Sequence, residues 1–576
     1  MKTRFLILLL LTGTLAKAQN LLLIPDTLNG PVFNLNIAAG TRGFYPGFTT
    51  NTLGVNGDYL GPTLMVRNGD FVTMNVTNSI SDTTTLHWHG LHVPAQADGG
   101  PHITILPGTT WSPSFQIKDK AALYWYHPHL HMKTAEHVTK GVAGLIYVRD
   151  NEEDSLALPR TYGIDDIPLV VQTRAFNAAK QFEVVSALDT AVLVNGTLNA
   201  YVGLPAQVIR LRLLNAATER AINFGFSNNQ NFYQIGSDGG LLSAPVSLNR
   251  LMLVPGERAE ILVDLSALNG QTIYLMSYAS QIASGIYGAT NTQAMGPNII
   301  TGYTSNPLNG SNFNLLQINV IAQTPGAISA IPAALANVQP IPASSANKTR
   351  DFMFSPLVMG PTSSLIGPFV INMMSFDMMM INDTVKLNDT EIWQLTNQSR
   401  ISHPFHMHDV HFYILDINGV PPSPGMSGRK DVVLVPPQMG TVRFIAKFED
   451  YADPVFPYMY HCHMLTHEDD GMMGQFIVVD STTGVNELAS SLDQNFSIFP
   501  NPVFSRKLNI KWNGAAIKYG SFAVIDMKGQ EVFLKFVDIT QGKEKQIDIG
   551  NIAAGIYTIR LKTPSGYYYQ KLIVMD

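Results

Sequence analysis

The sequence predicts an all-β protein made of several sandwich domains, and three observations carry this prediction. Short runs alternate between apolar and polar residues, as in residues 72–77, where Val72, Met74 and Val76 would share one face. A period of two indicates a half-buried strand. Glycine and proline break such runs about every ten residues, for example at Gly61-Pro62, a spacing typical of sandwiches. Hydrophobic residues form 45% of the 576 residues, enough for several cores.

The first 18 residues have the parts of a secretory signal peptide. Lys2 and Arg4 precede the apolar run 5–11, and Ala16-Lys17-Ala18 ends the segment. We expect cleavage after Ala18 and export. A membrane anchor is the alternative, but the run is well below the roughly 20 residues that a spanning helix needs. Since no other stretch is long and apolar enough, we expect a mature protein without a transmembrane segment, soluble or attached to a surface.

Two breaks in composition divide the rest of the chain. Residues 322–347 are rich in proline, alanine and serine, as a linker would be, and residues 480–494 are polar. Boundaries near 150, 325 and 482 follow. We therefore expect sandwich domains at residues 19–150, 151–325 and 346–482, and a further small sandwich at residues 495–576.

Charge argues against one class of partner. Only 14% of the residues are charged, and the net charge is −6. A nucleic-acid partner would call for a basic patch, so no nucleic-acid partner is expected.

The histidines are confined to two stretches of the chain. All fifteen fall within residues 87–137 or residues 403–467, and none lies between Val138 and Ser402. Histidines scattered through cores or over the surface would not leave such a gap. We expect the two clusters to meet around one site, and the middle domain, without histidine, to be a structural spacer.

Four short segments contain His-x-His pairs: His87-Trp88-His89, His127-Pro128-His129, His406-Met407-His408 and His461-Cys462-His463. Residues two apart on a strand point to the same face, so each pair can aim two imidazoles at one place. Eight histidines are too many for one ion, and the pattern predicts a multinuclear metal site between two domains.

Cys462 is the only cysteine and cannot form an internal disulfide. On a strand it would face away from its two flanking histidines and bind a different ion. His403 lies an odd number of residues from His406 and can face the same way, together with His467 and Met472. Two histidines, a cysteine and a long axial methionine suit a copper that transfers single electrons. Covalent bonds would then join this site to the multinuclear one.

These segments resemble the copper-binding signatures of the three-domain multicopper oxidases, the laccase-like family, over about residues 40–480. The resemblance implies three cupredoxin-like Greek-key β-sandwiches and four copper ions. It implies a type 1 copper on His403, Cys462, His467 and axial Met472, with the adjacent Met473 as the alternative that the family spacing disfavours. An axial methionine predicts a modest redox potential. The resemblance also implies a type 2 copper on His87 and His406, and a type 3 pair on His89, His127, His129, His408, His461 and His463. His92, His102, His131, His137 and His411 match no ligand of the family.

Two acids match those that the family uses to deliver protons for dioxygen reduction. Asp98 follows the first histidine pair, and Glu468 follows His467 directly. Asp98 also starts Asp98-Gly99-Gly100-Pro101, where an aspartate is common in a turn for structural reasons alone.

The reducing substrate is open between several classes. The run Asp377-Met378-Met379-Met380 resembles a stretch that in related bacterial enzymes flanks the type 1 site and takes part in oxidising cuprous ion, although methionines also fill irregular cores. The long methionine-rich insertion of dedicated cuprous oxidases is absent. A laccase-like activity toward phenols and aromatic amines is therefore expected. Cuprous oxidation for copper detoxification and copper binding at the cell surface without turnover are the alternatives.

The last segment resembles the C-terminal sorting domains of type IX secretion substrates. Its Pro500-Asn501-Pro502 opening and its Gly555-Ile556-Tyr557 and 571–574 endings occur in the family's order. This implies a secretion machinery as partner, and a secreted or cell-surface protein. A carbohydrate-binding or spacer sandwich is the alternative.

Overall fold

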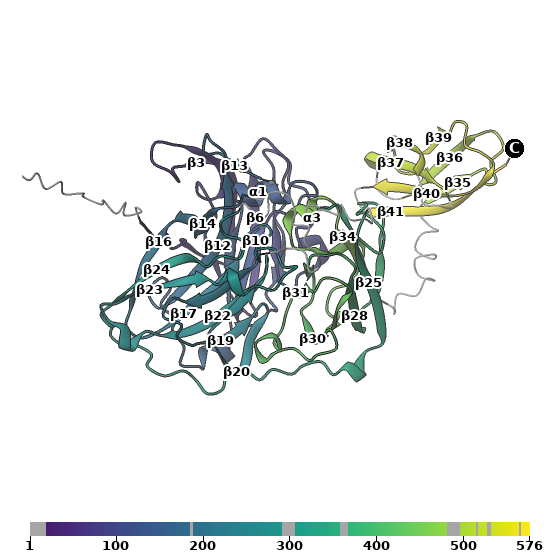
Figure 1. The fold of residues 1–576 in the computed structure, drawn as a ribbon. Helices are drawn as coiled ribbons and strands as arrows, with labels where there is room; N and C mark the ends of the chain where they lie inside the picture. The colour runs from purple at the N-terminus through teal and green to yellow at the C-terminus, as the bar shows by residue number, and fades with distance from the viewer. Residues whose placement is uncertain are drawn as a thin grey trace, which may run out of the picture. The chain divides into compact units, whose positions relative to one another are not determined.

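The computed structural model describes residues 19–184, 188–290, 306–357, 367–480, 496–513, 516–526, 531–563 and 566–575. The predicted signal peptide lies outside these residues. The predicted all-β class is confirmed, with three sandwiches in residues 19–480 and a small fourth one after them (Figure 1). The alternation predicted for residues 72–77 is also present, because Val72, Met74 and Val76 are buried.

The first sandwich packs a five-stranded sheet, in the order β2-β5-β11-β10-β7, on a second sheet in the order β4-β3-β6-β8, with β9 paired to β6. Its strands are β2 (Thr27–Asn29), β3 (Val32–Arg42), β4 (Thr50–Val55), β5 (Thr63–Arg67), β6 (Phe71–Asn78), β7 (His87–His89), β8 (Thr110–Trp111), β9 (Ser114–Gln116), β10 (Ala122–His127) and β11 (Gly144–Arg149).

The second sandwich packs the sheet β15-β14-β12-β17-β22-β19-β20, with β13 on β12, against the sheet β1-β16-β24-β23-β18-β21. Its strands are β1 (Asn20–Leu21), β12 (Asp166–Phe176), β13 (Phe182–Glu183), β14 (Ala191–Val194), β15 (Thr197–Leu198), β16 (Ala200–Pro205), β17 (Val208–Asn215), β18 (Ile222–Phe226), β19 (Phe232–Ser237), β20 (Gly240–Leu248), β21 (Leu251–Leu253), β22 (Arg258–Asp264), β23 (Thr272–Ser277) and β24 (Phe313–Ile321). The first strand of the described chain, β1, therefore belongs to the second sandwich.

The third sandwich packs the sheet β26-β25-β28-β32-β30 against the sheet β27-β34-β33-β29-β31. Its strands are β25 (Lys348–Pro356), β26 (Phe369–Ile371), β27 (Asp383–Lys386), β28 (Thr390–Asn397), β29 (His403–Met407), β30 (Phe412–Ile417), β31 (Val432–Val435), β32 (Gly440–Lys447), β33 (Asp453–Cys462) and β34 (Met473–Val479). Its core includes Trp393, Phe405, Cys462 and Met472.

Helices are short, and two of them, α1 and α3, contact each other across the first and third sandwiches. The α-helices are α1 (Thr134–Lys140), α2 (Asn151–Asp154) and α3 (Leu465–Asp469), and the 3-10 turns are η1 (Ala95–Ala97), η2 (Ser266–Leu268), η3 (Ala279–Gln281), η4 (Ala343–Ser345) and η5 (Pro424–Met426). Asp469 at the end of α3 accepts hydrogen bonds of 2.9 Å from the backbone N–H groups of Thr134 and Ala135. A carboxylate there satisfies the free donors of the first turn of α1, and so joins the two domains beside the histidines.

The C-terminal sandwich is a separate compact unit. Its two sheets have the orders β35-β36-β39 and β38-β37-β40-β41. Its strands are β35 (Phe496–Phe499), β36 (Lys507–Trp512), β37 (Ile517–Ile525), β38 (Glu531–Ile539), β39 (Glu544–Asp548), β40 (Gly555–Thr563) and β41 (Gly566–Val574).

Candidate metal centre

Strand pairing brings the four His-x-His segments to one place. In the first sandwich β7 runs antiparallel to β10, with His87 opposite His127. In the third sandwich β29 runs antiparallel to β33, with His406 opposite His461. Because a strand presents alternate residues on one face, each register also carries the second histidine of its pair toward the same region.

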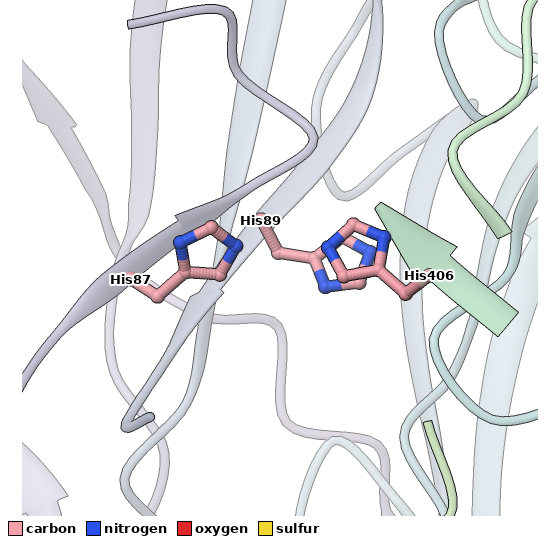
Figure 2. Close-up of side chains that lie close together, drawn as sticks. All are labelled: His87, His89 and His406. Atoms are coloured by element: carbon pink, nitrogen blue, oxygen red, sulfur yellow. The ribbon is translucent and has the colours of Figure 1, made fainter. Parts of the chain in front are cut away.

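The eight histidines form three groups whose ring nitrogens lie within 4.8 Å of one another: His87, His89 and His406; His89, His127 and His463; and His129, His408 and His461. All eight are buried. Figure 2 shows His87 and His89 on a strand of the first sandwich and His406 on a strand of the third. The rings of His89 and His406 are stacked, with centroids 3.8 Å apart. The cluster therefore draws its histidines from two domains.

Hydrogen bonds fix which nitrogen most of these rings present. Four rings donate Nδ1–H to backbone carbonyls, leaving Nε2 for the cluster: His87 to Asp98 at 2.9 Å, His127 to Pro128 at 2.8 Å, His406 to Asp431 at 2.8 Å and His461 to Cys462 at 3.1 Å. His89 differs, since its Nε2 lies 3.2 Å from Asp431 Oδ1 and its Nδ1 faces the cluster. Such partners orient metal-binding histidines.

The donor set fits a metal cluster. The Nε2 atoms of His87, His406 and His408 are buried without a hydrogen-bond partner, a costly state unless something binds there. Burial lowers the pKa of His127, His129 and His461 well below the ordinary value. The rings are thereby kept neutral, which is the state that binds metal.

The cysteine lies in a second, separate group. Cys462 Sγ is 3.5 Å from His403 Nδ1 and 3.6 Å from His467 Nδ1, and all three residues are buried. Met472 is buried in the same core, and its carbonyl accepts from the Cys462 N–H at 3.0 Å. Burial raises the pKa of the Cys462 thiol, so a bound metal would be needed to hold it as a thiolate.

Both candidate acids contact the histidine cluster. Asp98 Oδ2 accepts from His408 Nδ1 at 2.8 Å, and Oδ1 lies 3.3 Å from His87 Nδ1. Burial acts to raise the pKa of Asp98, but His408 and His87 lower it below its ordinary range. Glu468 lies between a histidine of the first sandwich and one of the third. Its Oε1 is 3.4 Å from His129 Nδ1, and its Oε2 is 3.2 Å from His461 Nδ1.

The methionine run lies next to the cysteine group. The N–H of Phe376 donates to the carbonyl of Gly471, directly before Met472, at 3.0 Å. Gln475 on β34 donates to the carbonyls of Met378 and Met380 at 3.2 and 2.8 Å. Met379 is 71% exposed and Met380 36% exposed, so the interpretation that these methionines fill a core is wrong for both.

The five histidines without a matching role lie around these groups in separate places. His92 is 3.0 Å from Asp409 Oδ1, His102 2.6 Å from Gln475 Oε1, His137 3.1 Å from Thr84 Oγ1, His411 3.6 Å from Asp431 Oδ2, and the His131 ring 5.2 Å from that of Phe376. None of them belongs to the groups of potential ligands found among the described residues.

Comparison with known proteins identifies the family. Two family models described as multicopper oxidase match residues 37–153 and 344–482. The multicopper oxidase mco of Staphylococcus haemolyticus is 33% identical over 459 residues, which cover 78% of this chain and 88% of that protein. The chain belongs to the multicopper oxidase family. It is therefore an oxidoreductase that uses copper, and the family implies dioxygen and a reducing substrate.

Further proteins are similar in sequence or in structure. The cell division protein FtsP of Escherichia coli K12 is 31% identical over 478 residues, 81% of this chain and 94% of that protein. A laccase-like multicopper oxidase from a lignin-degrading Ochrobactrum species is 33% identical with a TM-score of 0.69, covering 80% of this chain and all of that one. A metallo-oxidase of Campylobacter jejuni is 26% identical with a TM-score of 0.64, covering 81% and 95%.

The predicted sorting domain is confirmed by a third match. Residues 497–575 match a family model described as a secretion system C-terminal sorting domain. The described residues include no helix long and apolar enough to cross a membrane.

Proposed function

We propose that this multicopper oxidase binds four copper ions, one in the cysteine group and three in the histidine cluster. His403, Cys462 and His467, together with Met472, would hold the type 1 ion. Bound copper would supply one-electron oxidation of a donor at the cysteine group and four-electron reduction of dioxygen to water at the cluster. The proposal is supported above all by the two buried groups of donors, of which only one contains sulfur.

The histidine groups suggest how the cluster ions are shared. We assign His87 and His406 to the type 2 ion. The type 3 ions then have one triad each, His89, His127 and His463 for one and His129, His408 and His461 for the other. Each triad mixes ligands from the first and third sandwiches, so the cluster depends on the contact between the two domains.

The chain itself supplies the path and the orientation. Cys462 is bonded through the backbone to His461 and His463, so an electron leaving the sulfur crosses only a few covalent bonds before it reaches type 3 ligands. Asp98 accepts from His408 Nδ1 and fixes that ring. Glu468 is buried and is placed to hold a proton at Oε1 or Oε2 beside His129 and His461.

We propose phenols and aromatic amines as reducing substrates. The laccase-like relative is described as acting on lignin model compounds, and such donors need only an exposed edge near the type 1 ion. Cuprous ion is the second candidate, because the exposed thioethers of Met379 and Met380 are soft ligands and the Campylobacter relative is described as a metallo-oxidase.

Oxygen uptake by the purified, copper-loaded chain tests this function. An intense blue colour and oxygen consumption with a phenolic donor are expected. If the protein is blue but consumes no oxygen with any donor, cuprous ion included, the result would favour a copper-binding surface protein without turnover. A colourless loaded protein would contradict the type 1 assignment.

The sorting domain supports export through a type IX machinery. We propose that the oxidase acts at the cell surface or after release, with the C-terminal unit removed once export is complete.

A further inference from the structure

Arg258 connects the middle sandwich, which has no histidine, to the histidine cluster. It is the first residue of β22 and is fully buried. Its Nε donates to the carbonyl of Leu123 in the first sandwich at 3.1 Å, and its Nη2 donates to the carbonyl of Asp238 in the second at 2.9 Å. The same guanidinium binds both carboxylate oxygens of Asp431 in the third, at 2.5 and 2.6 Å. One side chain thus contacts all three domains.

Asp431 carries this contact to the cluster. Its Oδ1, which binds Arg258, also accepts from His89 Nε2 at 3.2 Å. Its backbone carbonyl accepts from His406 Nδ1 at 2.8 Å. His89 and His406 are the two stacked rings of Figure 2. Asp431 therefore contacts one ring from the first sandwich and one from the third.

The carboxylate contact determines which nitrogen His89 presents. Since Nε2 donates to Asp431, Nδ1 is the atom that faces the triad, 3.3 Å from His127 Nε2 and 3.2 Å from His463 Nε2. A carboxylate free to move would leave the ring free to turn. The two-pronged contact with Arg258 has a fixed geometry that a single contact lacks.

A glycine leaves room for this pair. Gly90 follows His89 and has φ of +89°, and a Cβ there would lie 2.6 Å from both Arg258 Nη2 and Asp431 Oδ2. Such a contact is too short for any side chain. The backbone next to the ligand therefore fits the arginine–carboxylate pair closely.

We propose that Arg258 is a positioning residue for the type 3 copper site: through Asp431 it holds His89 with Nδ1 toward the triad. The inference rests on the proposed function of the cluster. The middle sandwich, which has no histidine, would then help to orient a histidine of the metal centre.

Arg258→Lys tests this role, with Arg212→Lys as the matched control. Arg212 is equally buried in the same sheet and pairs with Asp166 and Glu260, both at 2.7 Å, away from the eight histidines. Both changes keep the positive charge and remove the two-pronged contact that a guanidinium makes with a carboxylate. We expect Arg258→Lys to bind type 3 copper about 10- to 100-fold more weakly, so that more of the bound copper is detected by EPR, while the blue absorption is unchanged. Arg212→Lys should match the parent in both signals.

Two further variants separate positioning from stability. Asp431→Asn leaves one acceptor oxygen where there were two and should lower the copper occupancy of the type 3 site in the same way. It tests the positioning role of the pair even if Arg258→Lys does not fold. The pair Arg258→Met with Asp431→Leu removes both charges together, which often costs little stability. Type 3 occupancy should stay low in it even where the melting temperature recovers.

Parental type 3 occupancy in folded Arg258→Lys or in Asp431→Asn would overturn the positioning role. Recovery of occupancy together with the melting temperature in the double variant would also overturn it. Failure of the proposed function is distinguishable, because the parent itself would then lack either the blue absorption or the EPR-silent copper pair.

Discussion

The cysteine group and the histidine cluster are built in different ways. His403, Cys462 and His467 all belong to the third sandwich and are buried there. The eight cluster histidines come half from the first sandwich and half from the third, and the second sandwich supports them through Arg258. The site proposed to accept electrons therefore takes its donor side chains from one domain, whereas the site proposed to reduce dioxygen takes them from two domains and contacts the third through Arg258.

The two groups are nevertheless joined at one strand end. Strand β33 ends at Cys462, with His461 before it and His463 after it. Alternation along the strand sends the sulfur to one group and the two imidazoles to the other. Variants can therefore separate the groups, and the following ones run from the largest expected effect to the smallest.

Cys462→Ser should remove the blue colour and reduce substrate oxidation by about a thousand-fold or more, since every electron is proposed to pass through this sulfur. The histidine cluster should still bind its copper, because none of its ligands changes. Visible absorption, copper content and oxygen uptake check these expectations. Full oxidase activity in this variant would disprove the electron path.

His408→Ala should give the opposite result. The imidazole belongs to a triad proposed for a type 3 ion and contacts Asp98, so dioxygen reduction should fall by about a thousand-fold or more. The blue colour should remain, and a donor should still bleach it once. His137→Gln is the control, because that buried ring binds Thr84 outside the cluster and should keep turnover. Loss of blue colour in His408→Ala would mean that the two groups are not independent.

Asp98→Asn and Glu468→Gln should have intermediate effects. Neither acid is proposed as a ligand, yet each contacts two cluster histidines. Changes to such partners cost about 10- to 100-fold in activity or metal affinity. We expect that loss in steady-state oxygen uptake, with unchanged blue colour and an unchanged rate of single bleaching by a donor. A slower bleaching step would place the defect at the cysteine group.

Much of this arrangement could be predicted from the sequence because it is local. A His-x-His pair on a strand fixes its own relative geometry, and Cys462 between two histidines fixes the link between the groups. The sandwich class followed from alternation in the same way. These features need only the period of a strand and no knowledge of distant contacts.

Other features depend on contacts across domains and could not be predicted. Arg258 occurs in Pro255-Gly256-Glu257-Arg258, which indicates a turn before a strand and nothing more. Its partner Asp431 is 173 residues away, and no local pattern pairs them. The same holds for His89, whose choice of nitrogen depends on that carboxylate. The absence of histidine therefore suggested that the middle domain is only a spacer, although its Arg258 is proposed to orient the ring of His89.

The smallest effect is expected at the methionine run beside the cysteine group. Replacing Met378, Met379 and Met380 together by alanine removes two exposed thioethers and one half-buried one, while the backbone carbonyls that bind Gln475 stay in place. Because the change leaves the ligands of both groups intact, the blue colour and turnover with a phenol should match the parent. If the run binds cuprous ion, KM for cuprous ion should rise several-fold, since soft ligands are lost, and kcat should change less. An equal fall with both donors would instead mean that the run supports the structure of the cysteine group, and no change with either would leave phenols and aromatic amines as the substrates.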